Sequence, residues 1–126
     1  MKLRHLFTIN IFFAVFFGVS CAVFPSFTSW LYGLVPDDAT IWVTRLAGGS
    51  ILGFATLMGF GRSSASTEAR RAIALALLIQ DAIGCIASIE FQLTGMVNFF
   101  GWLTIALYGA LALAYAYFLF IRPGDC

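Results

Sequence analysis

Four long apolar runs, separated by short polar breaks, dominate this 126-residue sequence and restrict what it can fold into. A helix that crosses a bilayer needs about 20 mostly apolar residues, and each run is close to that length. The runs extend over Leu6–Phe24, Ile41–Phe60, Ala72–Leu93 and Val97–Ile121. The sequence therefore predicts an all-α integral membrane bundle of four transmembrane helices, in a single domain over residues 1–126.

The overall composition excludes an ordinary water-soluble domain. Hydrophobic residues make up 61% of the chain and charged residues only 10%, against about 45–50% and about 25% in soluble domains. A chain of this size has too little interior to hide the excess apolar surface from water. The formal net charge of +1 provides no basic patch, so nucleic acid is not an expected partner, whereas the lipid bilayer is.

Residues that commonly hold cofactors are sparse. The three cysteines, Cys21, Cys85 and Cys126, are widely spaced and form neither a disulfide framework nor a metal motif. The only histidine is His5, which excludes a pair of histidine ligands to haem. The sequence thus contains no haem, metal or nucleotide motif, and it leaves open whether pigment, quinone or lipid binds between the helices.

Basic residues are concentrated on one side of the predicted bundle. Six of the seven lie at the side that the two termini share, and only Arg45 falls toward the other side, where Asp37 and Asp38 lie. The six are Lys2, Arg4, Arg62, Arg70, Arg71 and Arg122. Because lysine and arginine near span ends favour the cytoplasmic side, we predict cytoplasmic termini and a place in the bacterial inner membrane.

Small residues at helical spacing predict where the helices meet, because membrane helices associate through close backbone packing. In the second run, Gly49 and Gly53 share one face with Arg45, and in the third run Gly84 lies on a polar stripe. The first run is dominated by phenylalanine. The pattern therefore predicts that the second, third and fourth helices form the packed core and that the first helix leans on them.

Asp81 is the residue that most needs an explanation. It lies roughly 13 Å beyond the start of the third run, close to the middle of the membrane, with Gln80 beside it. Intramembrane ionisable groups are costly and commonly mark function. Two interpretations stand: a carboxylate that binds a proton or cation, or a carboxyl group that is protonated, or hydrogen-bonded to Tyr108, Thr56 or Thr104, and holds the bundle together.

Arg45 and Glu90 are predicted to lie at a similar shallow depth near the non-cytoplasmic surface. An ion pair between them would satisfy both charges. A second structural interpretation is that the long side chain of Arg45 extends to the interface, and the functional alternative is that Arg45 binds an anionic headgroup or substrate.

The chain resembles small four-span integral membrane proteins of bacteria to which no activity is assigned. The resemblance rests on Pro25 followed by Leu31–Gly33, on Arg45–Leu46 before a glycine-rich second run, and on Asn98–Trp102 at the start of the last run. It implies the four-span fold and no particular activity. Small multidrug exporters differ, because their intramembrane acid lies in the first span.

Two functions are compatible with these features, and neither requires catalysis. The first is a non-enzymatic accessory or structural subunit that associates with other membrane subunits or with itself. The alternative is a small oligomeric transporter or ion carrier in which Asp81 is the coupling site. No catalytic constellation is present, so we do not expect an enzyme.

Overall fold

The computed structural model describes the whole chain, from Met1 to Cys126, and contains only helices and the turns that connect them. Four helices are long and apolar enough to cross a membrane, which confirms the predicted all-α fold. The elements are α1 (Leu3–Val23), α2 (Pro25–Leu31), α3 (Asp38–Ser63), α4 (Thr67–Leu93) and α5 (Phe99–Ala116), followed by a π-helical turn (Tyr117–Ile121) and a 3-10 turn (Pro123–Asp125).

Short polar side chains set where three of the long helices begin. The carboxylate of Asp37 accepts a hydrogen bond from the backbone N–H of Thr40 and thereby caps the start of α3. Ser66 caps α4 in the same way, and Asn98 caps α5. Such caps satisfy N–H groups that have no partner within the helix. Ser66, which directly precedes the first residue of α4, is thus the cap of that helix.

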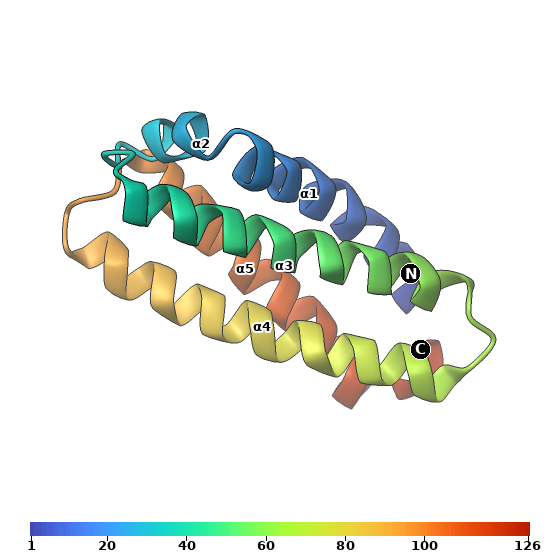
Figure 1. The fold of residues 1–126 in the computed structure, drawn as a ribbon. Helices are drawn as coiled ribbons and strands as arrows, with labels where there is room; N and C mark the ends of the chain where they lie inside the picture. Colours follow the sequence, from blue (N-terminus) through green and yellow to red (C-terminus); the bar gives the residue numbers. More distant parts are fainter.

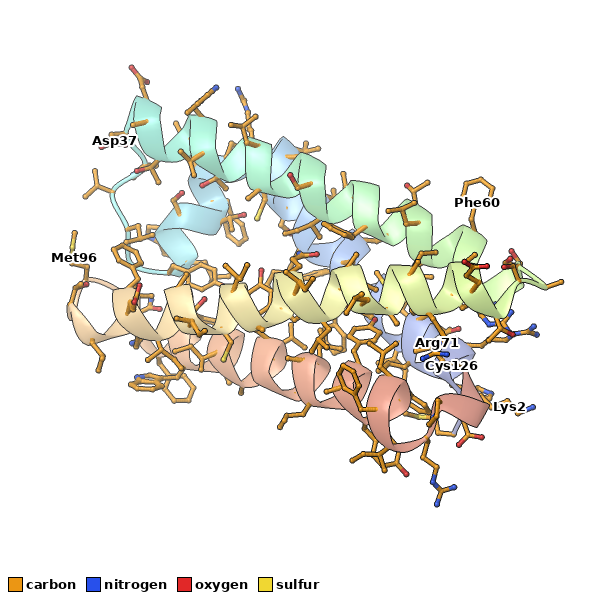
Figure 2. The ribbon with its side chains drawn as sticks, turned by 90° about the horizontal axis from the view of Figure 1, so that it is seen from below. Lys2, Asp37, Phe60, Arg71, Met96 and Cys126 are labelled. Atoms are coloured by element: carbon orange, nitrogen blue, oxygen red, sulfur yellow. The ribbon has the colours of Figure 1, made fainter.

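The bundle consists of two antiparallel hairpins. The first hairpin pairs α1 with α3, and the second pairs α4 with α5; contact between the two hairpins is much sparser. Both termini lie at one end, which we call the terminal end, whereas α2 and the α4–α5 turn lie at the far end (Figure 1). The helices α3 and α4 separate toward the far end, where Asp37 and Met96 lie (Figure 2).

The first hairpin is closed by a glycine contact that differs from the predicted one. A Cβ atom on Gly48 would lie 2.5 Å from the backbone N of Ala22 and 2.8 Å from the carbonyl oxygen of Gly18. Only glycine fits this crossing. By contrast, a Cβ atom on Gly49 or Gly53 would meet nothing within 4 Å, because both residues face outward. The prediction that Gly49 and Gly53 pack against neighbouring helices within the chain is therefore wrong by one position on the helix.

Helix α1 belongs to the core of the bundle, contrary to the expectation that it leans on the other three. It buries a stripe that starts at its first residue and faces α3, with Leu3 and Phe7 fully buried. Its exposed phenylalanines, such as Phe12 and Phe16, lie on the opposite side. The density of phenylalanine concealed this stripe, because an apolar residue occupies both the lipid-facing and the buried positions.

The packed core lies mainly in the terminal half of the bundle. Tyr115 is fully buried, and its ring lies 6.1 Å from that of Phe7. The amide nitrogen of Asn10 donates to the Tyr115 hydroxyl at 2.8 Å, and this hydroxyl lies 3.5 Å from the sulfur of Met58. Side chains of α1 and α3 thus contact the same tyrosine of α5. The other core residues of this half are Leu3, Leu6, Ala74, Leu77, Phe118 and Leu119.

Polar contacts hold the far end together. The Asn98 amide donates to the Leu31 carbonyl at 2.8 Å, and the Asn98 backbone N–H donates to the Tyr32 carbonyl at 3.1 Å. The Tyr32 hydroxyl is hydrogen-bonded to that of Thr104. Through these contacts α2 joins the first hairpin to the start of α5.

Candidate functional site

A cavity of about 290 Å³ lies between the two hairpins, from the middle of the bundle toward the far end. All five helices contribute to its wall, and 15 of its 22 lining residues are hydrophobic. Its volume is at the lower limit of small-molecule sites, which are about 300–1,000 Å³ and mostly apolar with a few polar groups. The aromatic rings in the wall belong to Phe13, Phe17, Tyr32, Phe54 and Tyr108.

The intramembrane acid singled out in the sequence lines this cavity. Asp81 lies at the middle of α4 and is only 3% exposed. Its Oδ2 atom is buried and has no hydrogen-bond partner. The neighbouring Gln80 also lines the cavity, and its Oε1 atom is likewise buried without a partner. Two unpaired acceptor oxygens, from consecutive residues, thus lie in one largely apolar wall.

The partners suggested for Asp81 are engaged elsewhere or turned away. The Tyr108 ring packs against Gly84, where a Cβ atom would lie 3.1 Å from the ring, and the Tyr108 hydroxyl forms no hydrogen bond. Thr104 is bonded to Tyr32. Thr56 is exposed and donates to a carbonyl of its own helix. The structure therefore does not contain the hydrogen bond expected of a carboxyl group that stabilises the bundle.

Several donors around the cavity are already used within the protein. The Thr28 hydroxyl donates to the Ser20 carbonyl at 2.9 Å, and the Ser29 hydroxyl donates to the Pro25 carbonyl at 2.9 Å. The Asn10 amide donates to Tyr115. What these groups leave free is the acceptor capacity of their oxygens, which adds to that of Asp81 and Gln80.

The cavity is not sealed from the outside of the bundle. Val43 and Phe13 line it while remaining 55% and 43% exposed, and Ala47 is also an exposed lining residue. Both Val43 and Ala47 lie within the first ten residues of α3, and it is toward this end, at Asp37, that α3 and α4 separate (Figure 2). In a bilayer this opening would face acyl chains, so an apolar molecule would have a route to the cavity from the membrane.

Arg45 and Glu90 are not paired in the structure. Both side chains are exposed, and the one ion pair in the chain joins Arg122 to Asp125 over 3.9 Å. The expected pairing fails because α3 and α4 make little contact and separate at this end. The two charges are therefore directed to the surroundings of the bundle and contribute nothing to the cavity.

A second hollow, of about 440 Å³, lies between the start of α4 and the π-helical turn that follows α5. Only seven residues line it, and it holds no buried unpaired polar atom. No group of three His, Cys, Asp or Glu side chains lies close enough to bind a metal ion. The cavity at Asp81 is thus the site with the most distinctive chemistry.

Sequence reasoning identified Asp81, Gln80 and Tyr108 but missed the other side of the cavity. Tyr32, directly after α2, contributes to the wall, and so does Phe54 of α3. Neither had a signal of its own, because aromatic residues are abundant throughout the chain. Comparison of the chain with protein-family models, with curated proteins and with solved structures finds no match.

Proposed function

We propose that this chain is a small integral membrane carrier that binds a largely apolar molecule in the cavity between its hairpins. Asp81 is the polar anchor of the site. The observation that supports the proposal is the unpaired, buried Oδ2 atom of Asp81 in the wall of an apolar cavity. A ligand with a hydrogen-bond-donating group would supply the missing partner.

A purely structural role accounts for Asp81 less well. A buried polar group that is left without a partner costs about 1–3 kcal/mol. A carboxyl group retained to stabilise the bundle would be expected to bond to another helix, as Asn10 does to Tyr115. Asp81 instead bears this cost in the free protein, which is typical of residues whose partner is a ligand.

Binding is tested with the purified chain in phosphatidylcholine nanodiscs. The cavity volume corresponds to about ten water molecules at about 30 Å³ each, so the probes are small aromatic alcohols, amides and amines. Equilibrium dialysis should show saturable binding beyond that of empty nanodiscs. Ala14→Phe, which fills the cavity, should weaken binding at least tenfold, whereas Ala110→Phe on the exposed face should not.

Carriage is tested separately from binding. Proteoliposomes preloaded with the tightest-binding probe should exchange it with labelled probe outside faster than protein-free liposomes do. Ala14→Phe should abolish the difference. Saturable binding without exchange would restrict the function to binding, and no saturable binding of any probe would refute the proposal.

We also propose that both termini face the cytoplasm and that the membrane is the bacterial inner membrane. The support is the concentration of six basic residues in the segments at the terminal end, which the positive-inside rule places in the cytoplasm. Fusions of a cytoplasm-dependent fluorescent reporter to either terminus should fluoresce. Insertion of the same reporter in the loop at Pro36 should not, and the reverse pattern would invert the orientation.

Association with other membrane subunits is a second candidate function. It is favoured by an outward stripe on α3 in which Arg45 is unpaired and Gly49, Gly53 and Thr56 are exposed. Small residues of this kind let another helix approach closely. Intact-complex mass spectrometry from native membranes should then detect a stoichiometric partner, and Gly49→Leu should release it. A monomer under mild extraction would remove this candidate.

A further inference from the structure

Building on the proposed function, we infer that the molecule bound between the hairpins is a lipophilic organic cation whose ammonium group pairs with the Asp81 carboxylate. The inference narrows the ligand from any donor-bearing apolar molecule to one chemical class. It rests on the charges, the hydrogen-bonding capacity and the aromatic content of the cavity wall.

The charges of the wall favour a cation. No Lys, Arg or His lines the cavity, and Asp81 is its only carboxyl group. No basic side chain of the chain forms an ion pair with Asp81. A bound cation would neutralise this carboxylate at close range, in a medium where an unpaired charge is costly. An anionic ligand would instead meet a like charge.

The buried polar atoms of the wall that have no partner point the same way. Oδ2 of Asp81 and Oε1 of Gln80 are buried and unpaired, and both can only accept hydrogen bonds. Thr28 and Ser29 have donated their hydroxyl hydrogens to backbone carbonyls. An ammonium group has only donors to offer, and consecutive acceptors at Gln80 and Asp81 suit its three N–H bonds.

The remaining wall suits the apolar body of such a ligand. Five aromatic rings line the cavity, and a cation near an aromatic face is attracted by the negative charge of that face. A polar ligand with many hydroxyl groups would leave most of them unpaired against the 15 hydrophobic residues of the wall. The complementary molecule therefore carries one charged group on an aromatic or aliphatic body.

The test compares two probes of equal size that differ in charge. These are 2-phenylethylamine, which is an ammonium ion at pH 7, and 2-phenylethanol. In phosphatidylcholine nanodiscs, with binding to empty discs subtracted, the wild-type chain should bind the amine at least tenfold more tightly than the alcohol. Asp81→Asn should remove most of this preference and leave the affinity for the alcohol within about threefold of wild type, since only an ionic contact is lost.

Asp81→Glu is the conservative variant and should retain the preference for the amine. It also keeps the test valid if Asp81→Asn does not yield folded protein, which size-exclusion chromatography would reveal. Equal affinity for the two probes in the wild type, or a preference that persists in Asp81→Asn, would overturn the cation inference while leaving the carrier proposal intact. If neither probe nor any other of the panel binds, the carrier proposal itself fails.

Discussion

The same long helices form the terminal half and the far half of the bundle, but side chains fill the centre of the terminal half and leave the centre of the far half open. In the terminal half, Tyr115 fills the centre and its hydroxyl is hydrogen-bonded to Asn10. In the far half, the corresponding hydroxyl of Tyr32 is bonded to Thr104 at the side of the bundle, and the centre is a cavity. The same residue type thus closes one half and frames an opening in the other.

The difference follows from what lies between the hairpins at each end. In the terminal half, Tyr115 projects from α5 into contact with Phe7 of α1 and Met58 of α3. In the far half, α2 is bonded to the start of α5 through Asn98, and α3 separates from α4. Side chains therefore fill the terminal half, whereas the far half retains the space in which a ligand would sit.

The largest effect is expected from emptying the centre of the terminal half. Tyr115→Ala removes a fully buried ring and should lower the free energy of unfolding by about 3–5 kcal/mol. Thermal unfolding in mild detergent measures the loss. Tyr117→Ala, at a position that is 40% exposed, is the matched control and should have little effect. Similar losses for the two variants would contradict the packing described for this half.

The glycine contact in the first hairpin provides the next test. Gly48→Val would force a side chain against the backbone of Ala22 and should cost about 1–3 kcal/mol or more. Gly49→Val, one position along and open to the surroundings, should be nearly neutral. The same thermal assay distinguishes the two, and a larger loss at Gly49 would mean that the helix is rotated relative to this structure.

Replacing each of two buried polar residues by leucine should change the free energy of unfolding in opposite directions. Asn10→Leu removes a hydrogen bond to Tyr115 and should destabilise the chain by about 1–3 kcal/mol. Asp81→Leu removes an unpaired oxygen beside a cavity with room for the new side chain, so it should stabilise the ligand-free chain by a similar amount. Destabilisation by Asp81→Leu would indicate that Asp81 supports the bundle directly.

A smaller difference in the free energy of unfolding is expected between Tyr115→Phe and Tyr108→Phe. Tyr115→Phe loses a hydroxyl that is bonded to Asn10 and should cost about 1 kcal/mol. Tyr108→Phe loses a hydroxyl without a hydrogen bond, so the change should stay within about 0.5 kcal/mol. Unfolding of the two variants side by side provides the comparison, and a larger cost at Tyr108 would reveal a hydrogen bond that the structure lacks.

The smallest expected effect concerns the helix caps at the two ends. The side chain and backbone of Thr40 hydrogen-bond to Asp37 and hold the pKa of this carboxyl below its usual value. A lowered pKa stabilises the folded state above the unfolded pKa, and this contribution is lost as the pH falls from about 5 to about 2. The protection of the Thr40 amide against exchange, relative to its intrinsic exchange rate at each pH, should therefore fall over that range.

The Asp37→Asn variant is the control for the cap, because it keeps an acceptor oxygen and removes the ionisable group. Exchange at Thr40 in this variant should not respond to pH beyond the intrinsic chemistry of exchange. The start of α4 is a second control, since Ser66, which does not titrate in this range, caps it. An equal response at both ends would assign the effect to general acid unfolding.

The existence of the long helices could be predicted from sequence because hydrophobic length is a local property. The packing could not, because it depends on rotation about each helix axis, which the sequence defines poorly in uniformly apolar segments. Gly49 and Gly53 fitted a known pattern, yet Gly48 makes the contact. The burial of α1 was hidden for the same reason, since lipid and protein interior favour the same residues.

The candidate site was predictable only in part. Asp81 stood out because a charge in an apolar run is conspicuous without any knowledge of the fold. Its lack of a partner was not predictable, since that depends on where Tyr108 and Thr104 are directed. The Arg45–Glu90 pair was inferred from equal depth alone, and depth does not reveal that α3 and α4 diverge. A cavity is a feature of spacing between helices and leaves no motif.

The division into two hairpins also has a consequence for biosynthesis. The connection from α3 to α4 is a short turn at Ser64–Ser66, and α1 and α3 find each other within the part of the chain made first. Every residue of the first hairpin precedes α4 in the chain, so the contact between α1 and α3 needs nothing that is synthesised later. The cavity, by contrast, requires both hairpins, because residues of all five helices line it. Newly inserted first hairpins would expose Asn10 to lipid until Tyr115 arrives, so the hydrogen bond between them marks the completion of assembly.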